Sequence, residues 1–331
     1  MPENLQIERE ASEREALVHA ASGVAAPPWA QVVAPDVVGL RIGIVNVFFI
    51  GEPGGPWVLV DAGVGNCAGK IVRAAEERFG AGTKPVAIVL THAHFDHVGA
   101  LPELAEKWDV PVYAYALEMP YVTGRAMYPP PDPTVGGGAM AWLSFVYPRG
   151  GPDLGQRAQM LPHDGTVPHL AEWRAVETPG HTPGHISLFR DADRVLIAGD
   201  AVITTKQESA LAVLTQKKEV RRPPAYFTTN WTQARESVQK LAALEPQSMG
   251  TGHGQPMSGE PLRAALHHLA ENFDEIGVPE KGIYVNDPAL ADETGPTHVP
   301  LAANVANLKI KWGATAALAL ALYIWQRRRA A

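Results

Sequence analysis

The feature that most constrains this chain is a cluster of four potential metal ligands within six residues. His92, His94, Asp96 and His97 follow the apolar run 86–90, which predicts a buried strand. Chance produces such a cluster on the order of once per thousand chains of this composition. A lone histidine here would indicate a solvated loop. Three histidines and an aspartate side by side are costly to bury unless a metal ion holds the imidazoles neutral, so the cluster predicts metal binding.

Composition limits the chemistry of such a site. The chain has twelve histidines but one cysteine, Cys67, so imidazole and carboxylate are the expected ligands and an internal disulfide is excluded. The formal net charge is −7, and it falls to −12 without the five positive charges of residues 305–331. A body this acidic lacks the excess of basic residues that is typical of nucleic-acid-binding proteins, so we expect a small-molecule substrate and no nucleic-acid partner.

Further ligand candidates follow later predicted strands. His181 and His185 lie in Thr-Pro-Gly-His-Thr-Pro-Gly-His after the strand 173–177, Asp200 ends the run Leu-Ile-Ala-Gly-Asp, and His253 stands between glycines. Glycine lets the backbone approach a cluster closely, so these loops suit a shared centre. The remaining histidines match no such pattern and are expected on the surface or in ordinary packing.

Together these motifs resemble the metallo-β-lactamase superfamily, within it the branch of glyoxalase II thioesterases and lactonases. The resemblance spans about residues 41–256 and includes Asp61 in Leu-Val-Asp-Ala-Gly. It implies an α/β fold, a four-layer αβ/βα sandwich. It also implies that His92, His94 and His181 hold one metal ion, that Asp96, His97 and His253 hold a second, and that Asp200 bridges them. Asp61 and His185 are expected to support the ligands by hydrogen bonds.

The resemblance implies a hydrolase in which a hydroxide bridging two divalent ions attacks an ester, lactone or thioester, with Asp96 accepting and returning its proton. Zinc is the first choice, and iron or manganese also suits these ligands. Cys67 precedes the main motif, which argues against the lactamases that bind metal through a late cysteine. Ile203 stands where many lactonases have tyrosine, and the end of the chain has no convincing match to the basic glutathione-binding domain of glyoxalase II.

Three other functions remain open at this stage. The same pair of ions could hydrolyse a phosphodiester, although the acidic body offers only the cluster of Lys217, Lys218, Arg221 and Arg222 to a polyanion. A single iron would instead indicate a persulfide dioxygenase-like oxidoreductase. A binding protein on a degenerate scaffold is disfavoured because all seven expected ligands are present.

The chain divides into four predicted parts. Residues 1–40 form a leader, 41–275 the catalytic domain, 276–304 a linker and 305–331 an apolar and basic C-terminal helix. Within the domain we expect strands at 41–50, 57–61, 86–90, 110–114, 173–177, 186–190 and 195–198. Helices are expected at 68–79, 101–108, 230–245 and 261–273.

An aromatic-rich insertion at about 120–165 interrupts the domain. It is expected to lie outside the core, either as a lid over a substrate with an apolar portion or as an edge strand or a homodimer contact. Candidate substrate contacts come from this insertion and from the segments after Asp200, with ordinary packing as the alternative for each: Trp142, Phe145, Tyr147, Lys206, Glu208 and Tyr226.

The two ends differ in character. The acidic N-terminus has no apolar core of a signal peptide, and the single cysteine suits the reducing cytoplasm. At the other end, the apolar run 312–325 is short for a membrane span, so residues 305–331 predict either a membrane-associated helix or a docked one.

Overall fold

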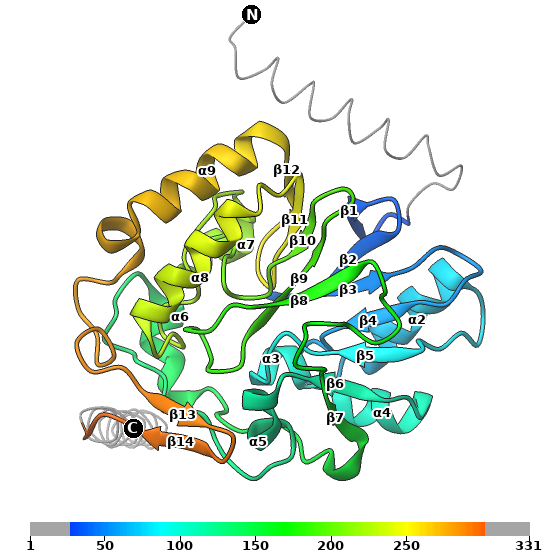
Figure 1. Ribbon diagram of the computed structural model, residues 1–331, viewed down its shortest axis with the longest axis horizontal. Helices are drawn as coiled ribbons and strands as arrows, with labels where there is room; N and C mark the ends of the chain where they lie inside the picture. The colour runs from blue at the N-terminus through cyan, green and yellow to red at the C-terminus, as the bar shows by residue number, and fades with distance from the viewer. Residues whose placement is uncertain (1–26, 302–331) are drawn as a thin grey trace, which may run out of the picture.

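The computed structural model describes residues 27–301. In that part of the chain, two β-sheets face each other (Figure 1). The first sheet has the strand order β1 (Ala30–Ala34), β2 (Val37–Ile42), β3 (Val45–Ile50), β4 (Val58–Val60), β5 (Ala87–Val89), β6 (Val112–Ala114) and β7 (Ala158–Met160). The second has the order β12 (Met257–Ser258), β11 (Ser248–Gly250), β10 (Val195–Ile197), β9 (Ile186–Arg190) and β8 (Trp173–Glu177).

Helices cover the outer face of each sheet. On the first sheet lie α2 (Ala68–Phe79) and α4 (Leu101–Trp108), and on the second lie α8 (Trp231–Ala243) and α9 (Gly259–Glu271). Each pair of helices buries its apolar side against the sheet that it covers. Ile71 and Leu104 lie in the core of the first sheet, and Val238 and Leu266 lie in the core of the second. A third core lies between the sheets. The predicted four-layer αβ/βα sandwich is therefore confirmed.

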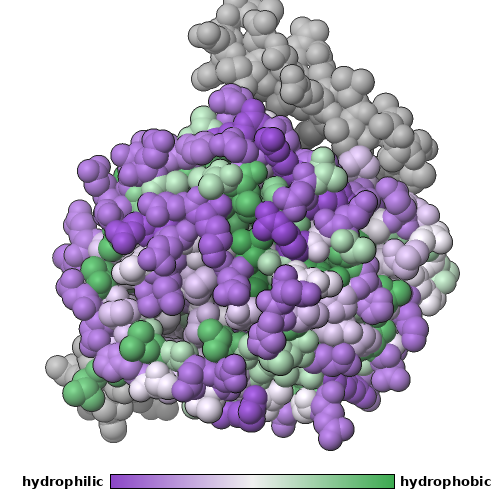
Figure 2. All heavy atoms as spheres, viewed as in Figure 1, coloured by the Kyte–Doolittle hydropathy of each residue, from purple (hydrophilic) through white to green (hydrophobic). Residues whose placement is uncertain are grey.

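Short elements occupy the connections. They are α3 (Phe95–Val98), η1 (Ala116–Glu118), α5 (Met119–Val122), α6 (Ala139–Trp142), η2 (Leu143–Val146), η3 (Gly155–Arg157), α7 (Ala210–Thr215), η4 (Phe273–Gly277) and the hairpin β13 (Leu290–Asp292) with β14 (Gly295–His298). Most of the visible surface is hydrophilic, and hydrophobic side chains show in the hollow between α9 and β1 (Figure 2).

The structure corrects the predicted start of the domain. Residues 30–40 are part of the first sheet, and Val37 and Val38 are buried. The predicted strand 41–50 is also wrong, because the chain turns at Gly43, which has φ of +65°, and residues 37–50 form the β2–β3 hairpin. Pro35 and Asp36, interpreted as part of an irregular leader, form the tight connection between β1 and β2.

The prediction that residues 120–165 lie outside the core is wrong for part of this segment, whereas the alternative of an edge strand is confirmed by β7, the last strand of the first sheet. Tyr121 and Tyr128 are buried in the first core, and β7 extends the first sheet by pairing in parallel with β6. A strand of three residues has too little pattern to be recognised among the prolines and glycines that surround it.

The predicted linker 276–304 packs on the domain over its described part. Tyr284 is buried and its hydroxyl donates to the Pro130 carbonyl at 2.6 Å. The predicted C-terminal helix 305–331 lies outside the described residues. Among residues 27–301, no helix combines the length and the apolar character that a membrane crossing requires.

Candidate metal centre

The potential ligands meet because each follows the end of a strand. The cluster His92 to His97 comes after β5, His181 after β8, Asp200 after β10 and His253 after β11. Strands β10 and β11 are parallel, and β8 runs in the same direction because both β8 and β10 are antiparallel to β9. Their carboxyl ends therefore open at one edge of the second sheet, facing the loop after β5.

Two groups of ligand atoms form at this edge. His92, His94 and His181 make one group, and Asp96, His97 and His253 make the other; within each, the ligand atoms lie within 4.8 Å of one another. Asp200 lies between them. Its Oδ2 is 3.4 Å from His181 Nε2 and 3.1 Å from His253 Nε2, and its Oδ1 is 3.5 Å from His97 Nε2.

Burial sets the electrostatics of the first group. Loss of hydration lowers the pKa of His92 and His94 well below the usual value, and it lowers the pKa of His181 to about 3. These imidazoles are therefore neutral at physiological pH, which is the form that coordinates a metal ion.

Charge pairing dominates the Asp200 side of the centre. Burial opposes the charged form of Asp200, but His253 and His97 together hold its pKa well below the usual value. Burial likewise lowers the pKa of His97, but Asp200 and Asp61 outweigh it and raise the pKa well above 6.5.

Neighbouring hydrogen bonds fix the ligands in place. Asp61 Oδ2 lies 2.8 Å from His97 Nδ1, and the two Asp61 oxygens also accept from Thr91 N and Thr91 Oγ1. Asp61 holds this position with φ of +61°, a strained conformation for a residue other than glycine. His185 Nε2 accepts from Asp200 N at 2.9 Å, so its Nδ1 carries the proton and donates to Thr178 Oγ1. Both residues thus make the kind of contacts expected from the sequence.

The donor set fits a pair of divalent ions. Three buried atoms at its centre, His92 Nε2, His97 Nε2 and Asp200 Oδ1, have no hydrogen-bond partner among the described residues. Such atoms are costly to bury unless a ligand engages them. Two ligands that are each about 2.0–2.2 Å from a tetrahedral ion lie about 3.3–3.6 Å apart. The distances from Asp200 to the three histidine nitrogens, 3.1–3.5 Å, are similar.

A match to a known family agrees with this geometry. Residues 40–253 match the Metallo-beta-lactamase superfamily, a range that includes every ligand candidate. The chain belongs to the metallo-β-lactamase superfamily.

Two proteins of Bacillus subtilis that are similar to this chain are named as probable metallo-hydrolases. The chain is 53% identical over 245 residues to the "Probable metallo-hydrolase YflN", covering 73% of this chain and 93% of the relative. It is 28% identical over 218 residues to the "Probable metallo-hydrolase YybB", covering 66% of this chain and 84% of that relative. The structure of a beta-lactamase domain protein from Burkholderia ambifaria has a TM-score of 0.52 at 22% identity, covering 74% of this chain and 76% of that one, which shows the fold. The family match and the similarity to YflN support a metal-dependent hydrolase.

The predicted substrate contacts of this metallo-β-lactamase superfamily member fall in different places. Tyr147 and Tyr226 belong to an aromatic cluster beside the ligands, with ring centroids 5.8 Å apart. Phe145 is buried and packs edge-on against Trp142, which is 60% exposed. Glu208 is buried and accepts from Ala225 N at 3.1 Å, so it holds the loop of Tyr226.

Lys206 is half-buried, and its carbonyl accepts the backbone N–H of Ser209 in a turn.

Sequence reasoning missed residues that support the centre from a distance. Asn46 is buried on β3, and its amide donates to Thr251 O and Gly254 O, which fixes the loop of His253. Phe227 stacks on the ligand candidate His94 with ring centroids 4.4 Å apart. The aromatic pair Tyr226-Phe227 was the available signal for Phe227, whereas nothing in the sequence pattern distinguishes Asn46 from other polar residues in strands.

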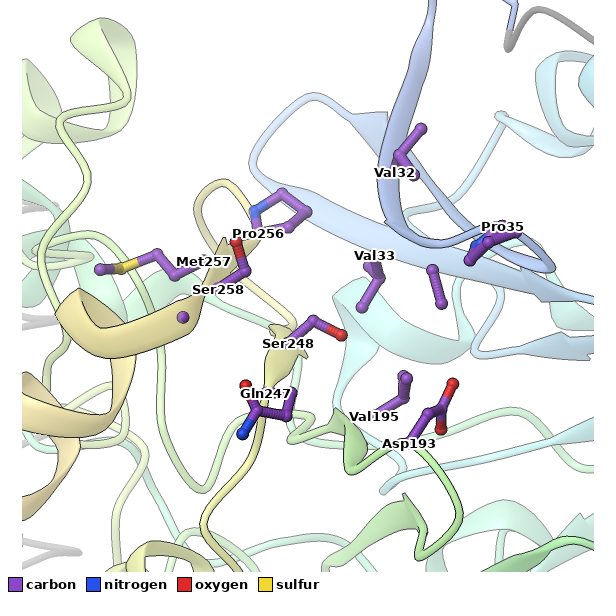
Figure 3. Close-up of a pocket in the computed structure, with 12 residues that line it drawn as sticks. Val32, Val33, Pro35, Asp193, Val195, Gln247, Ser248, Pro256, Met257 and Ser258 are labelled. Carbon is purple, nitrogen blue, oxygen red and sulfur yellow. The ribbon is translucent and has the colours of Figure 1, made fainter. Parts of the chain in front are cut away.

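A separate cavity of about 290 Å³ lies at the opposite ends of β10 and β11 (Figure 3). It is lined by Val33 of β1, Pro35 of the β1–β2 connection, and Ser248 and Met257 of the second sheet. It contains none of the ligand candidates, so it is distinct from the centre.

Proposed function

We propose that this protein is a dinuclear metal-dependent hydrolase that cleaves the ester, lactone or thioester bond of a small molecule with an apolar portion. The observation that carries the proposal is the pair of ligand groups, His92/His94/His181 and Asp96/His97/His253, with Asp200 in contact with both. A single ion held by the first group would leave His97 Nε2 of the second group buried without a partner among the described residues.

Two divalent ions, with zinc the first choice and iron or manganese also suited to these ligands, would polarise the substrate carbonyl and acidify a water molecule at this centre. The chain supplies the remaining functions. Asp96 Oδ2 lies 3.6 Å from His253 Nε2, at the edge of the second group, and burial raises the pKa of this carboxyl. The proposed role of this carboxyl is to accept a proton from water and to return it to the leaving oxygen or sulfur.

An aromatic wall suits the apolar portion of the substrate. Phe227, stacked on His94, contacts Tyr147 and Tyr226, and Tyr147 also contacts Phe95 with ring centroids 5.7 Å apart. Tyr147 is the more exposed of the two tyrosines, so a substrate entering from solvent would meet it first. Burial and then Asp96 raise the pKa of both tyrosines, which keeps their phenols protonated and able to donate a hydrogen bond.

The charges around the centre favour a carbonyl substrate over a phosphodiester. The charged groups that act most strongly on the two aspartates are His97 and His253, together with Asp200 in the case of Asp96, and no lysine or arginine is among these groups. Enzymes that bind phosphate esters commonly place such cations on the phosphate oxygens.

The test combines metal analysis with a substrate panel. The purified full chain is assayed for metal content and then for hydrolysis of aryl esters, lactones, thioesters and bis-aryl phosphates. We expect two ions per chain and activity on one or more carbonyl substrates. Activity confined to the phosphates would overturn the substrate class. A single iron with oxygen uptake would overturn the hydrolase.

Substitutions of two ligand candidates test whether hydrolysis takes place at this centre. We expect His92→Ala and Asp200→Ala to lose hydrolysis while the far-ultraviolet circular dichroism stays that of the parent. The control is His163→Ala, which alters an exposed histidine outside the ligand groups. Near-full turnover in His92→Ala or Asp200→Ala would contradict the assignment of the centre.

A further inference from the structure

A buried glutamate outside both ligand groups joins the segments that carry the first one. Glu118 ends η1, just after β6, and its side chain is fully buried. Its two oxygens accept four hydrogen bonds, and no lysine or arginine pairs with it in the described part of the chain. Burial raises the pKa of Glu118 to about 7, while the hydrogen bonds act in the opposite direction.

Each oxygen of Glu118 serves a different ligand segment. Oε2 accepts from Ala93 N at 3.0 Å and from the Tyr128 hydroxyl. Ala93 lies between His92 and His94 in the chain. Oε1 accepts from Thr182 Oγ1 at 2.7 Å and from Gly184 N at 2.9 Å. Thr182 directly follows His181, so one carboxylate spans the two segments that supply the first ligand group.

The surroundings leave this arrangement little freedom. A Cβ added at Gly184 would lie 2.7 Å from Glu118 N, so the loop of His181 is in close contact with η1. On the other side, Tyr128 stacks on Tyr121 with ring centroids 3.9 Å apart, and its ring is tilted against that of His94 with centroids 4.6 Å apart. The Tyr128 hydroxyl also accepts from Ala93 N at 3.0 Å. A displacement of Glu118 would therefore move both segments.

We propose that Glu118 is a positioning residue that clamps residues 92–94 to residues 181–184 and thereby sets the spacing of His92, His94 and His181 for metal binding. The inference rests on the proposed function in one respect, that this centre binds metal. Partners of this kind typically change metal affinity by about 10- to 100-fold when they are removed. Glu118 accepts hydrogen bonds from residues next to His92, His94 and His181 and from none next to His97 or His253, so we expect the larger effect on one of the two ions.

Substitution by glutamine tests the clamp at constant volume. An amide has one acceptor oxygen, so Glu118→Gln keeps the hydrogen bonds to one segment and turns a donor toward the donors of the other. The matched control is Asp132→Asn. Asp132 is also buried and accepts from Thr134 N, Thr134 Oγ1 and Ile283 N, none of which lies in a ligand segment.

The measurement is a titration of the metal-free full chain with cobalt(II), followed by its visible absorption spectrum and by calorimetry. For Glu118→Gln we expect one binding step to weaken by about 10- to 100-fold with a changed ligand-field spectrum, and the other step to stay within about threefold. Asp132→Asn is expected to keep both steps. If Glu118→Gln does not fold, Thr182→Val removes a single donor to Oε1 and is expected to weaken the same step by a smaller factor.

Three results would overturn the clamp. They are parental affinity for both ions in Glu118→Gln, an equal loss of both steps, and the same losses in Asp132→Asn. The titration uses no substrate, so a parent chain that binds two ions but hydrolyses nothing would contradict the proposed function and leave this inference standing. A parent chain that binds no ion would overturn both.

Discussion

Gly252 occupies a position where a single methyl group should disturb the centre without straining the backbone. A Cβ built there would overlap Asp200 Oδ1 and would lie 2.8 Å from His97 Cε1. The backbone cannot retreat freely, because Gly252 O accepts from Asn46 N and Gly252 N donates to Gly199 O, each at 2.8 Å. Gly252→Ala must therefore displace Asp200, the residue in contact with both ligand groups, or His97.

Overpacking of this kind costs about 1–3 kcal/mol. If the whole of that cost lowers the free energy of metal binding, the loss of affinity is about 5- to 150-fold, since about 1.4 kcal/mol is a factor of ten. The assay is metal titration of the metal-free variant, with kcat/KM for an ester substrate as the second measurement. The control is Gly69→Ala on α2, where the new Cβ would meet only Arg73 at 3.7 Å and where alanine favours the helix. A Gly252→Ala protein with parental metal affinity and kcat/KM would refute the placement of Asp200 between the two groups.

Three further outcomes are expected. Arg190→Met should lower the free energy of unfolding by about 2 kcal/mol, because Arg190 is nearly buried and pairs with Asp36 and Asp193. Arg174 is more exposed, so Arg174→Met should lower it by under about 1 kcal/mol. Equal midpoints of urea unfolding for the two variants would contradict this expectation. Burial raises the pKa of the Cys67 thiol from 9.0 to about 11, so the fraction of thiolate near neutral pH falls about 100-fold, and Ellman's reagent should react at least that much more slowly with native than with unfolded protein. Equal rates would show an accessible thiol. Tyr147→Ala should raise KM about tenfold for esters with a large apolar group and little for acetyl esters; a uniform change across the series would argue against the aromatic wall.

The sequence by itself determined the elements that carry strong local patterns. The helices at 68–79 and 101–108 and the strands at 173–177 and 186–190 have the predicted bounds, because their apolar spacing and their glycine, proline or polar ends are local properties. The ligand candidates could likewise be read from the sequence, since histidines and aspartates after strand ends form short motifs. The structure brings all seven of them together at one edge of the second sheet.

Tertiary structure alone decided the contacts that hold these residues in place. The β1–β2 hairpin and the three-residue strand β7 pair at the two ends of the first sheet, and neither has a strong pattern of its own, so their formation depends on the rest of the sheet. Glu118 shows the same limit at the centre. It is one of 35 acidic residues in the sequence, and its place between residues 92–94 and 181–184 arises from segments that are far apart along the chain. Hydrogen bonds across such distances depend on how the two sheets pack, which local sequence does not encode.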